Sequence, residues 1–268
     1  MFAKINHVAI VSDNYAQLGK FYEAVFAMKN SPLQRATQAV TVGDGYVGLN
    51  INPRRAGRSA GLDHFGIEVD DVESVFERMR KSYGQVKWLK RPSNRPFAGI
   101  TTHDPDGNTF DLSQKNMSNR AAIYVENDGK ANPRHINHVG MRTMHPEDVA
   151  QFFREVFELA PGNKSAGDPN HYLSDGKVTL AVMPWQITDF LGSGIERPAL
   201  DHIGFKVESM SAFKADLEKH AQTYSGPKDD RPEKNPEREV RQKLFAKCCF
   251  GQFQMSDPDG VLIDVSEN

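Results

Sequence analysis

Residues 62–69 read LDHFGIEV, and residues 200–207 read LDHIGFKV. In both stretches an LDH triplet is followed by apolar residues at alternate positions and by a glycine. This alternation predicts a β-strand with one face on a hydrophobic core. Because the pattern occurs twice, 138 residues apart (202 − 64 = 138), it predicts two copies of one fold in a single chain.

Two further pairs of stretches extend the repeat. INHVAI at 5–10 returns as INHVGM at 136–141, and DPDGNTFD at 104–111 returns as DPDGVLID at 257–264. The three motifs have the same order in each half, so the repeat covers nearly the whole chain. We expect a first domain over 1–115, a linker rich in Asn and charge over 116–134, and a second domain over 135–268.

The segments between these strands predict amphipathic helices and hairpins. In each half, apolar residues recur at i, i+3, i+4, i+7 and i+8, which is the spacing of one buried helix face. An Asp-Gly turn signal follows in each half, at 44–45 and 175–176. We therefore expect an α+β fold in which each half runs strand, helix and short strands, twice over. The apolar face of the first helix of each half is formed by Leu18, Phe21, Tyr22, Val25 and Phe26, and by Val149, Phe152, Phe153, Val156 and Phe157.

Charge and composition exclude several classes of partner. The net charge of -2 and the pI near 6.5 give no general attraction to nucleic acid or to an anionic membrane. The two cysteines, Cys248 and Cys249, are adjacent and poorly placed to bridge each other, which fits a reducing compartment. No apolar stretch has membrane-spanning length. A soluble cytoplasmic protein is the expectation.

Each half carries two histidines and one aspartate in the repeated motifs. Strand alternation places each of them opposite an apolar face, and each histidine has a small residue two positions away. Two histidines and a carboxylate form the ligand set of a metal site with open positions, most typically non-haem Fe(II). The alternative is a set of hydrogen-bonded structural residues, which a duplicated fold would keep just as faithfully. The sequence thus favours at least one metal site and leaves a second open, with the ligands His7, His64, Asp111, His138, His202 and Asp264.

These motifs resemble those of the vicinal oxygen chelate (VOC) superfamily, which includes glyoxalase I, fosfomycin-resistance proteins, methylmalonyl-CoA epimerases and extradiol ring-cleaving dioxygenases. The resemblance rests on NHVAI, LDHFGIEVDDV and HDPDGNTFDL in the first half, and on NHVGMRT, LDHIGFKVES and SDPDGVLIDV in the second. It implies two tandem VOC domains, each built from paired βαβββ modules that form a cupped mixed sheet. Such a cup holds a divalent metal, and the resemblance places the metal ligands on the same six residues.

The chain departs from this family at two points. The carboxylate ligand of the family is usually glutamate, whereas both halves here have aspartate. Fe(II) is favoured, while Zn, Mn and Ni stay open. Extradiol dioxygenases also have an acid–base histidine and a tyrosine, where this chain has Gly176, Lys177 and Gln254 in the second half and Thr101 in the first. Family members assemble their ligands within one half or across halves, and the sequence allows both.

Two neighbouring residues of the second half are candidate catalytic groups. His171 and Tyr172 are reasonable proton-transfer residues if they face a cup. The alternative is an exposed start of a strand.

A basic and aromatic segment precedes the third ligand strand of the first half. Arg91, Arg95 and Phe97 are candidate substrate-binding residues at the rim of the cup, where arginine would bind a carboxylate and an aromatic ring would form an apolar wall. The alternative is a solvated basic loop.

Three functions follow from these observations, in order of preference. The first is an Fe(II) dioxygenase acting on a small oxygenated substrate of aromatic and acidic character. The second is a glyoxalase-like or epimerase-like lyase or isomerase that uses a divalent metal as a Lewis acid. The third is a small-molecule binding protein without turnover. In each case the partner is a small molecule, with no nucleic acid and no membrane, and a homo-oligomer is left open.

Overall fold

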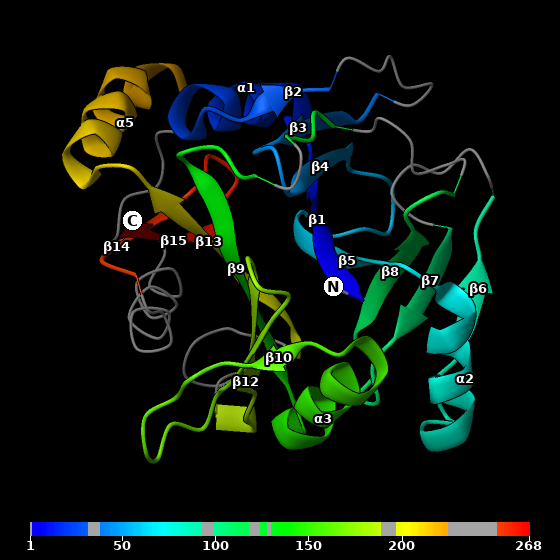
Figure 1. Ribbon diagram of the computed structural model, residues 1–268. Coiled ribbons are helices and arrows are strands. Elements are labelled where there is room, and N and C mark those ends of the chain that lie inside the picture. Colours follow the sequence, from blue (N-terminus) through cyan, green and yellow to red (C-terminus); the bar gives the residue numbers. More distant parts are fainter. Residues whose placement is uncertain are drawn as a thin grey trace.

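The computed structural model describes residues 2–31, 38–92, 99–117, 124–127, 130–188, 197–224 and 251–268. Two mixed β-sheets form, one from each repeat (Figure 1). The first has the order β2-β3-β4-β1-β5-β8-β7-β6. Its strands are β1 (Ala3–Ser12), β2 (Lys29–Asn30), β3 (Val40–Gly43), β4 (Gly48–Pro53), β5 (Gly61–Val69), β6 (Trp88–Lys90), β7 (Ile100–His103) and β8 (Thr109–Gln114).

The second sheet repeats this arrangement with the order β10-β11-β12-β9-β13-β15-β14. In each sheet the first strand runs parallel to one neighbour and antiparallel to the other, as β9 does with β12 and β13. The predicted α+β fold with two tandem cupped sheets is therefore confirmed. The strands are β9 (His135–Thr143), β10 (Ala160–Pro161), β11 (His171–Ser174), β12 (Thr179–Pro184), β13 (Ala199–Val207), β14 (Phe253–Ser256) and β15 (Leu262–Glu267).

The helices are α1 (Tyr15–Phe26), α2 (Val72–Ser82), α3 (Pro146–Phe157) and α5 (Met210–Tyr224). The predicted apolar faces of α1 and α3 are buried at every named position. Pro146 occupies the first turn of α3, where a missing amide hydrogen costs nothing. None of the described helices is long and apolar enough to cross a bilayer.

The two halves share one hydrophobic core. Phe26 of α1 stacks on Phe205 of β13 with 3.9 Å between ring centroids, so a helix of the first half packs on a strand of the second. The equivalent helix α3 of the second half packs on the first half in the same way, with 5.9 Å between the ring centroids of Phe153 and Phe65 of β5. Each half therefore completes the hydrophobic burial of the other.

Turn carboxylates also bind across the halves, and they do so in equivalent pairs. Asp44 accepts a hydrogen bond from the backbone N–H of Ile136 at 2.7 Å, and Asp175 accepts one from Ile5 at 2.8 Å. Both contacts obey the 131-residue offset of the repeat (175 − 44 = 136 − 5 = 131). The Asp-Gly turns thus provide hydrogen-bond acceptors for buried amides at the start of β9 and β1.

The DPDG turns form a second reciprocal set. The carboxylate of Asp106 accepts hydrogen bonds from the hydroxyl of Thr143 and the backbone N–H of His145, just before α3. Asp259 accepts one from the hydroxyl of Ser12. These contacts tie each DPDG turn to the end of the first strand of the opposite half.

Candidate metal centre

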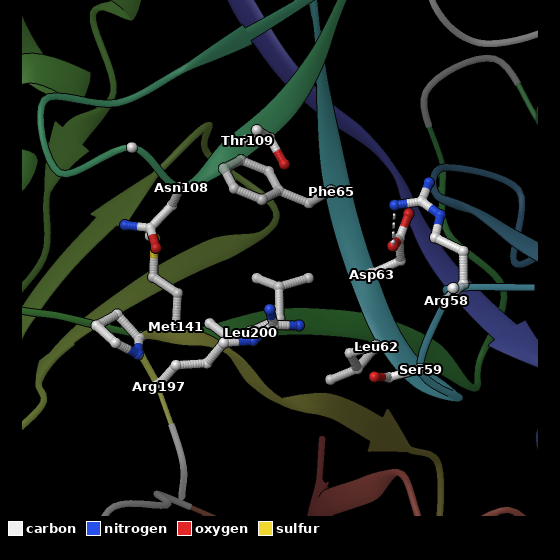
Figure 2. A pocket seen from close by; sticks show the side chains of 14 residues that line it. Arg58, Ser59, Leu62, Asp63, Phe65, Asn108, Thr109, Met141, Arg197 and Leu200 are labelled. Atoms are coloured by element: carbon white, nitrogen blue, oxygen red, sulfur yellow. Dashed lines mark ion pairs between the residues drawn. The ribbon is translucent and has the colours of Figure 1, made fainter.

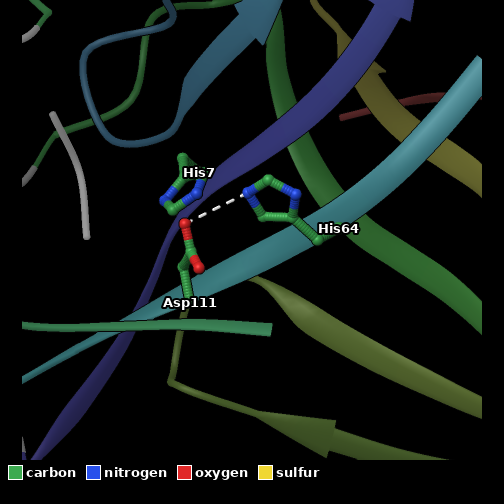
Figure 3. A group of neighbouring side chains, drawn as sticks. All are labelled: His7, His64 and Asp111. Atoms are coloured by element: carbon green, nitrogen blue, oxygen red, sulfur yellow. Dashed lines mark ion pairs between the residues drawn. The ribbon is translucent and has the colours of Figure 1, made fainter. Parts of the chain in front are cut away.

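The three predicted ligands of the first half converge on one side of the sheet. His7 lies on β1, His64 on β5 and Asp111 on β8, which are three neighbouring strands (Figure 3). Gly66 pairs with both His7 and Asp111, so these residues share one row across the sheet. One ligand atom from each of the three lies within 4.8 Å of the others. The ligands of this cluster therefore assemble within one half.

A β-bulge precedes each histidine of the first half. The pairing of β1 with β5 skips Asn6 on one strand and Asp63 on the other. The extra residue turns its side chain toward the following histidine. Nδ1 of His7 lies 2.8 Å from Oδ1 of Asn6, and Nδ1 of His64 lies 2.7 Å from Oδ2 of Asp63.

The second half has the same bulges. The pairing of β9 with β13 skips Asn137 and Asp201. Nδ1 of His138 lies 3.0 Å from Oδ1 of Asn137, and Nδ1 of His202 lies 2.8 Å from Oδ2 of Asp201.

These four acceptors decide which nitrogen of each histidine can bind a metal. An oxygen that accepts from Nδ1–H leaves Nε2 as the ligand nitrogen of a neutral imidazole. These acceptors were not predicted from the sequence, although the sequence contains a signal for them. Every one of the four histidines directly follows an amide or carboxylate residue, namely Asn6, Asp63, Asn137 or Asp201.

The rings of His7 and His138 each occupy space left by a glycine of the adjacent strand, not by the small residue two positions along their own strand. A Cβ atom added at Gly66 would overlap the ring of His7, and one added at Gly204 would overlap the ring of His138. The small residue two positions after a histidine therefore makes room for the histidine of the adjacent strand. From the sequence alone, Gly66 would be expected to leave space beside His64. Strand pairing instead places Gly66 beneath the ring of His7 and Gly204 beneath the ring of His138.

Without a metal, the first cluster holds an ion pair. Nε2 of His64 lies 3.2 Å from Oδ2 of Asp111. Burial disfavours the charged imidazole, but hydrogen bonds and charges of Asp111 and Asp63 outweigh burial and raise the pKa of His64 to about 9. Burial likewise opposes ionisation of Asp111, yet the His64 imidazolium lowers the pKa of that carboxyl to about 2. The hydroxyl of Thr101 donates to Oδ1 of Asp111 at 2.6 Å.

In the second cluster the histidine lies farther from the carboxylate, and the carboxylate accepts more hydrogen bonds from other groups. Nε2 of His138 lies 3.5 Å from Oδ2 of Asp264, and the rings of His138 and His202 are 5.1 Å apart. Asp264 also accepts hydrogen bonds from the backbone N–H of Gly251 at 2.7 Å and from Nε2 of Gln254 at 3.2 Å. Among the residues that the structure describes, only the first cluster brings three ligand atoms within 4.8 Å.

The electrostatics of the second cluster also differ. Burial lowers the pKa of His138 to about 4 despite its contact with Asp264, so this imidazole is neutral. Asp201, the acceptor for His202, is bound at 2.9 Å by the buried guanidinium of Arg142. In the first half, Asp63 instead contacts the exposed Arg58 at 3.4 Å. The first half is the better candidate for a metal ion because its three ligand atoms lie within 4.8 Å of one another.

The donor set of the first cluster fits a divalent transition metal. Two imidazoles and one carboxylate suit iron, zinc, manganese or nickel, with coordination positions left over. Both Nδ1 atoms are occupied by oxygen partners, as is usual for ligand histidines.

The two candidate catalytic residues lie on β11. Nε2 of His171 lies 3.3 Å from a carboxylate oxygen of Glu147 on α3, so the ring lies on the helix side of the sheet. The hydroxyl of Tyr172 donates to Asp168 at 2.9 Å. Tyr172 pairs with Ala181, which in turn pairs with Gly140, so Tyr172 shares the sheet face of the second cluster. A catalytic role for either residue stays a prediction.

The candidate substrate-binding residues are only partly described. Arg91 follows β6, and its backbone N–H donates to Gly99 at 2.8 Å. Arg95 and Phe97 lie outside the described residues. Their roles at the rim of a cup stay predictions.

A family model matches the first half of the chain, and solved structures match its fold. The family model of the Glyoxalase/Bleomycin resistance protein/Dioxygenase superfamily matches residues 4–112. These residues contain all three ligands of the first cluster. No curated protein matches the chain.

Solved structures resemble the chain along its whole length. The Mn(II)-bound glyoxalase from Novosphingobium aromaticivorans superposes with a TM-score of 0.66 at 16% identity, over 99% of this chain and 82% of that one. The 2,3-dioxygenase LapB from Pseudomonas sp. KL28 gives 0.65 at 13% identity, over 99% and 92%. A xylose isomerase-like TIM barrel/4-hydroxyphenylpyruvate dioxygenase fusion protein gives 0.60 at 12% identity, and this chain spans 49% of its length. At these identities the likeness shows the tandem fold.

Proposed function

Because the family model of the Glyoxalase/Bleomycin resistance protein/Dioxygenase superfamily matches residues 4–112, we propose that this protein is a metal-dependent enzyme of that superfamily. We infer that His7, His64 and Asp111 hold the metal, and that the enzyme is an Fe(II) dioxygenase acting on a small oxygenated substrate. The observation that carries the proposal is the convergence of these three ligand atoms within 4.8 Å on neighbouring strands.

Neighbouring side chains hold the proposed ligands in position. Asn6 and Asp63 keep a proton on Nδ1 of the two histidines and so leave Nε2 as the donor. Asn6 is itself fixed, since its amide donates to the hydroxyl of Ser113 at 3.3 Å. A divalent ion at this site would leave open positions for two adjacent substrate oxygens, and Fe(II) would add reactivity toward O₂.

The carboxylate ligand has a partner of its own. The hydroxyl of Thr101 binds one oxygen of Asp111 and leaves the other facing His64. This contact restricts rotation of the aspartate. The proposed substrate is aromatic and acidic, on the basis of the candidate residues Arg91, Arg95 and Phe97.

Thr101 also supports a second candidate function. It pairs with Asp111 across β7 and β8, at the position where the resemblance to extradiol dioxygenases predicts tyrosine. Gln254 has the same place opposite Asp264. A Lewis-acid lyase or isomerase with Zn, Mn or Ni needs neither a tyrosine nor O₂ at this position.

Metal analysis tests the site. The full chain, purified anaerobically, is compared with His64→Ala and His202→Ala by elemental analysis. We expect about one divalent metal per chain, lost in His64→Ala and retained in His202→Ala. The reverse pattern, or wild-type protein that retains no metal when each divalent ion is supplied, would contradict the assignment.

Oxygen uptake then separates the two reactions. Iron-loaded protein is offered a panel of catechols and hydroquinones with acidic and neutral side groups. Consumption of O₂ by the iron form alone supports the dioxygenase. Turnover of 2-oxoaldehyde or hemithioacetal substrates by the zinc, manganese or nickel form, without O₂, supports the Lewis-acid enzyme instead.

A further inference from the structure

We propose that the cavity between the two halves is a binding site for a small organic carboxylate with an apolar body, separate from the metal cluster. The cavity has a volume of about 360 Å³, which is within the range of small-molecule sites. Its lining comes from both repeats, and Leu62 and Leu200, which occupy equivalent positions at the start of β5 and β13, both contribute (Figure 2).

Four apolar side chains form one part of the cavity, its floor, within a lining that is otherwise largely polar. Phe65 and Met141 join the two leucines, and they come from β5 and β9, on opposite sides of the boundary between the halves. Pro198 adds a rigid apolar wall. A ring or a short alkyl chain of a ligand could contact these side chains.

The rim of the cavity carries an excess of positive charge. Arg58 and Arg197 line it together with a single carboxylate, that of Asp63. Arg58 is within 3.4 Å of Asp63, whereas Arg197 has no ion pair with any carboxylate of the described chain. In Figure 2 the Arg58–Asp63 pair lies on one side and Arg197 approaches next to Leu200. Two guanidinium groups and one carboxylate leave a net charge of +1, which complements a monoanion.

Hydrogen-bonding groups complete the rim. Asn108, Thr109 and Ser59 line the same cavity and can orient the oxygens of a carboxylate. Guanidinium groups bind carboxylates with two parallel hydrogen bonds, so Arg197 is the residue that we expect to anchor the ligand. The apolar floor and the charged rim together distinguish an organic acid from a bare inorganic anion.

Asp63 connects this cavity to the metal cluster, but the cavity is not part of the cluster. One carboxylate oxygen of Asp63 faces Arg58 at the cavity, and the other accepts from Nδ1 of His64. A carboxylate in the cavity therefore contacts a residue that orients a proposed metal ligand. The binding itself needs no metal, so it can be tested independently of the proposed function.

Calorimetry on the metal-free full chain tests the site, with benzoate as the probe. We expect saturable binding, weakened about tenfold or more in Arg197→Gln. The matched control is Arg154→Gln, an exposed arginine on α3 that does not line the cavity and should bind benzoate like wild type. Circular dichroism and thermal unfolding confirm that both variants are folded.

Two further probes define the ligand class. Benzamide has the shape of benzoate without its charge, and inorganic phosphate has charge without an apolar body, so both should bind at least about tenfold more weakly. Absence of saturable benzoate binding overturns the proposal. Equal loss in the two arginine variants, or loss in His64→Ala but not in Arg197→Gln, overturns it as well, because the anion would then bind nonspecifically or at the metal cluster.

Discussion

Oδ2 of Asp63 accepts a hydrogen bond from Nδ1 of His64 at 2.7 Å, from the bulge position directly before the histidine. This contact makes the residue before His64 part of the proposed metal site. It also gives the first prediction.

Replacement of Asp63 should weaken metal binding more than it weakens the fold. Asp63→Ala removes the acceptor that orients His64, and we expect metal affinity to fall by about 10–100-fold. Asp63→Asn keeps an acceptor oxygen and should lose less. Asp70→Asn, an exposed residue of the same segment, is the control and should bind metal like wild type. Competition with a chromophoric chelator measures the affinities, and equal affinity in Asp63→Ala and Asp70→Asn would refute the role of the bulge.

The glycine beneath His7 gives the second prediction. In Gly66→Ala the new methyl group would overlap the ring of His7, so the ring must leave its position in the cluster. We expect most of the metal binding to be lost. Gly84→Ala is the matched control, since no atom lies within 4 Å of the added Cβ there. Elemental analysis of both variants decides the matter, and a fully loaded Gly66→Ala protein would show that His7 is no ligand.

The contacts between the halves give the third prediction. Asp175→Ala removes the acceptor of the buried backbone N–H of Ile5 and of the hydroxyl of Tyr46. A buried donor left without a partner costs about 1–3 kcal/mol, so the free energy of unfolding should fall by that amount or more. Asp13→Ala breaks only an exposed pair with Arg54 and should change stability by less than about 1 kcal/mol. Urea unfolding compares the two, and equal stability would argue against the reciprocal contacts.

Asp257 gives the fourth prediction, which concerns pH. Burial raises the pKa of its carboxyl from 3.8 to about 7, even though backbone amides and the hydroxyl of Tyr22 donate to it. Above its unfolded pKa the folded chain holds a proton that the unfolded chain has released. The contribution of this group to stability is therefore lost as pH rises through the folded pKa.

The variant Asp257→Asn isolates this effect. Between pH 5 and pH 8 the free energy of unfolding of the wild type should fall by about 3 kcal/mol more than that of Asp257→Asn, which has no proton to release at this position. Urea unfolding at several pH values measures the difference. Parallel pH profiles for the two proteins would show that Asp257 ionises normally in the folded chain.

Much of this architecture is predictable from the residues. Apolar spacing identified the buried faces of α1 and α3, because a helix must cover its apolar stripe whatever it packs on. Strand alternation and the repeat identified His7, His64 and Asp111 as candidate ligands, but left open whether they assemble within one half or across the halves. These features depend on the local spacing of apolar and polar residues, which can be read from the sequence.

Features that depend on strand register were not predictable in the same way. The bulges at Asn6 and Asp63 shift the strand pairing by one residue, and the composition of β1 and β5 does not predict such a shift. The packing of Phe26 on Phe205 likewise involves residues far apart in the chain. Arg95 and Phe97 of the basic segment lie outside the described residues, so the predictions for them stay open.

The matched contacts of Asp44 with Ile136 and of Asp175 with Ile5 have a consequence for the ancestry of the chain. They have the symmetry of an isologous dimer, in which each subunit offers its partner the same surface that it receives. A protein made of one repeat would pair with a second copy of itself through this surface. The present chain is then best understood as two such subunits fused end to end.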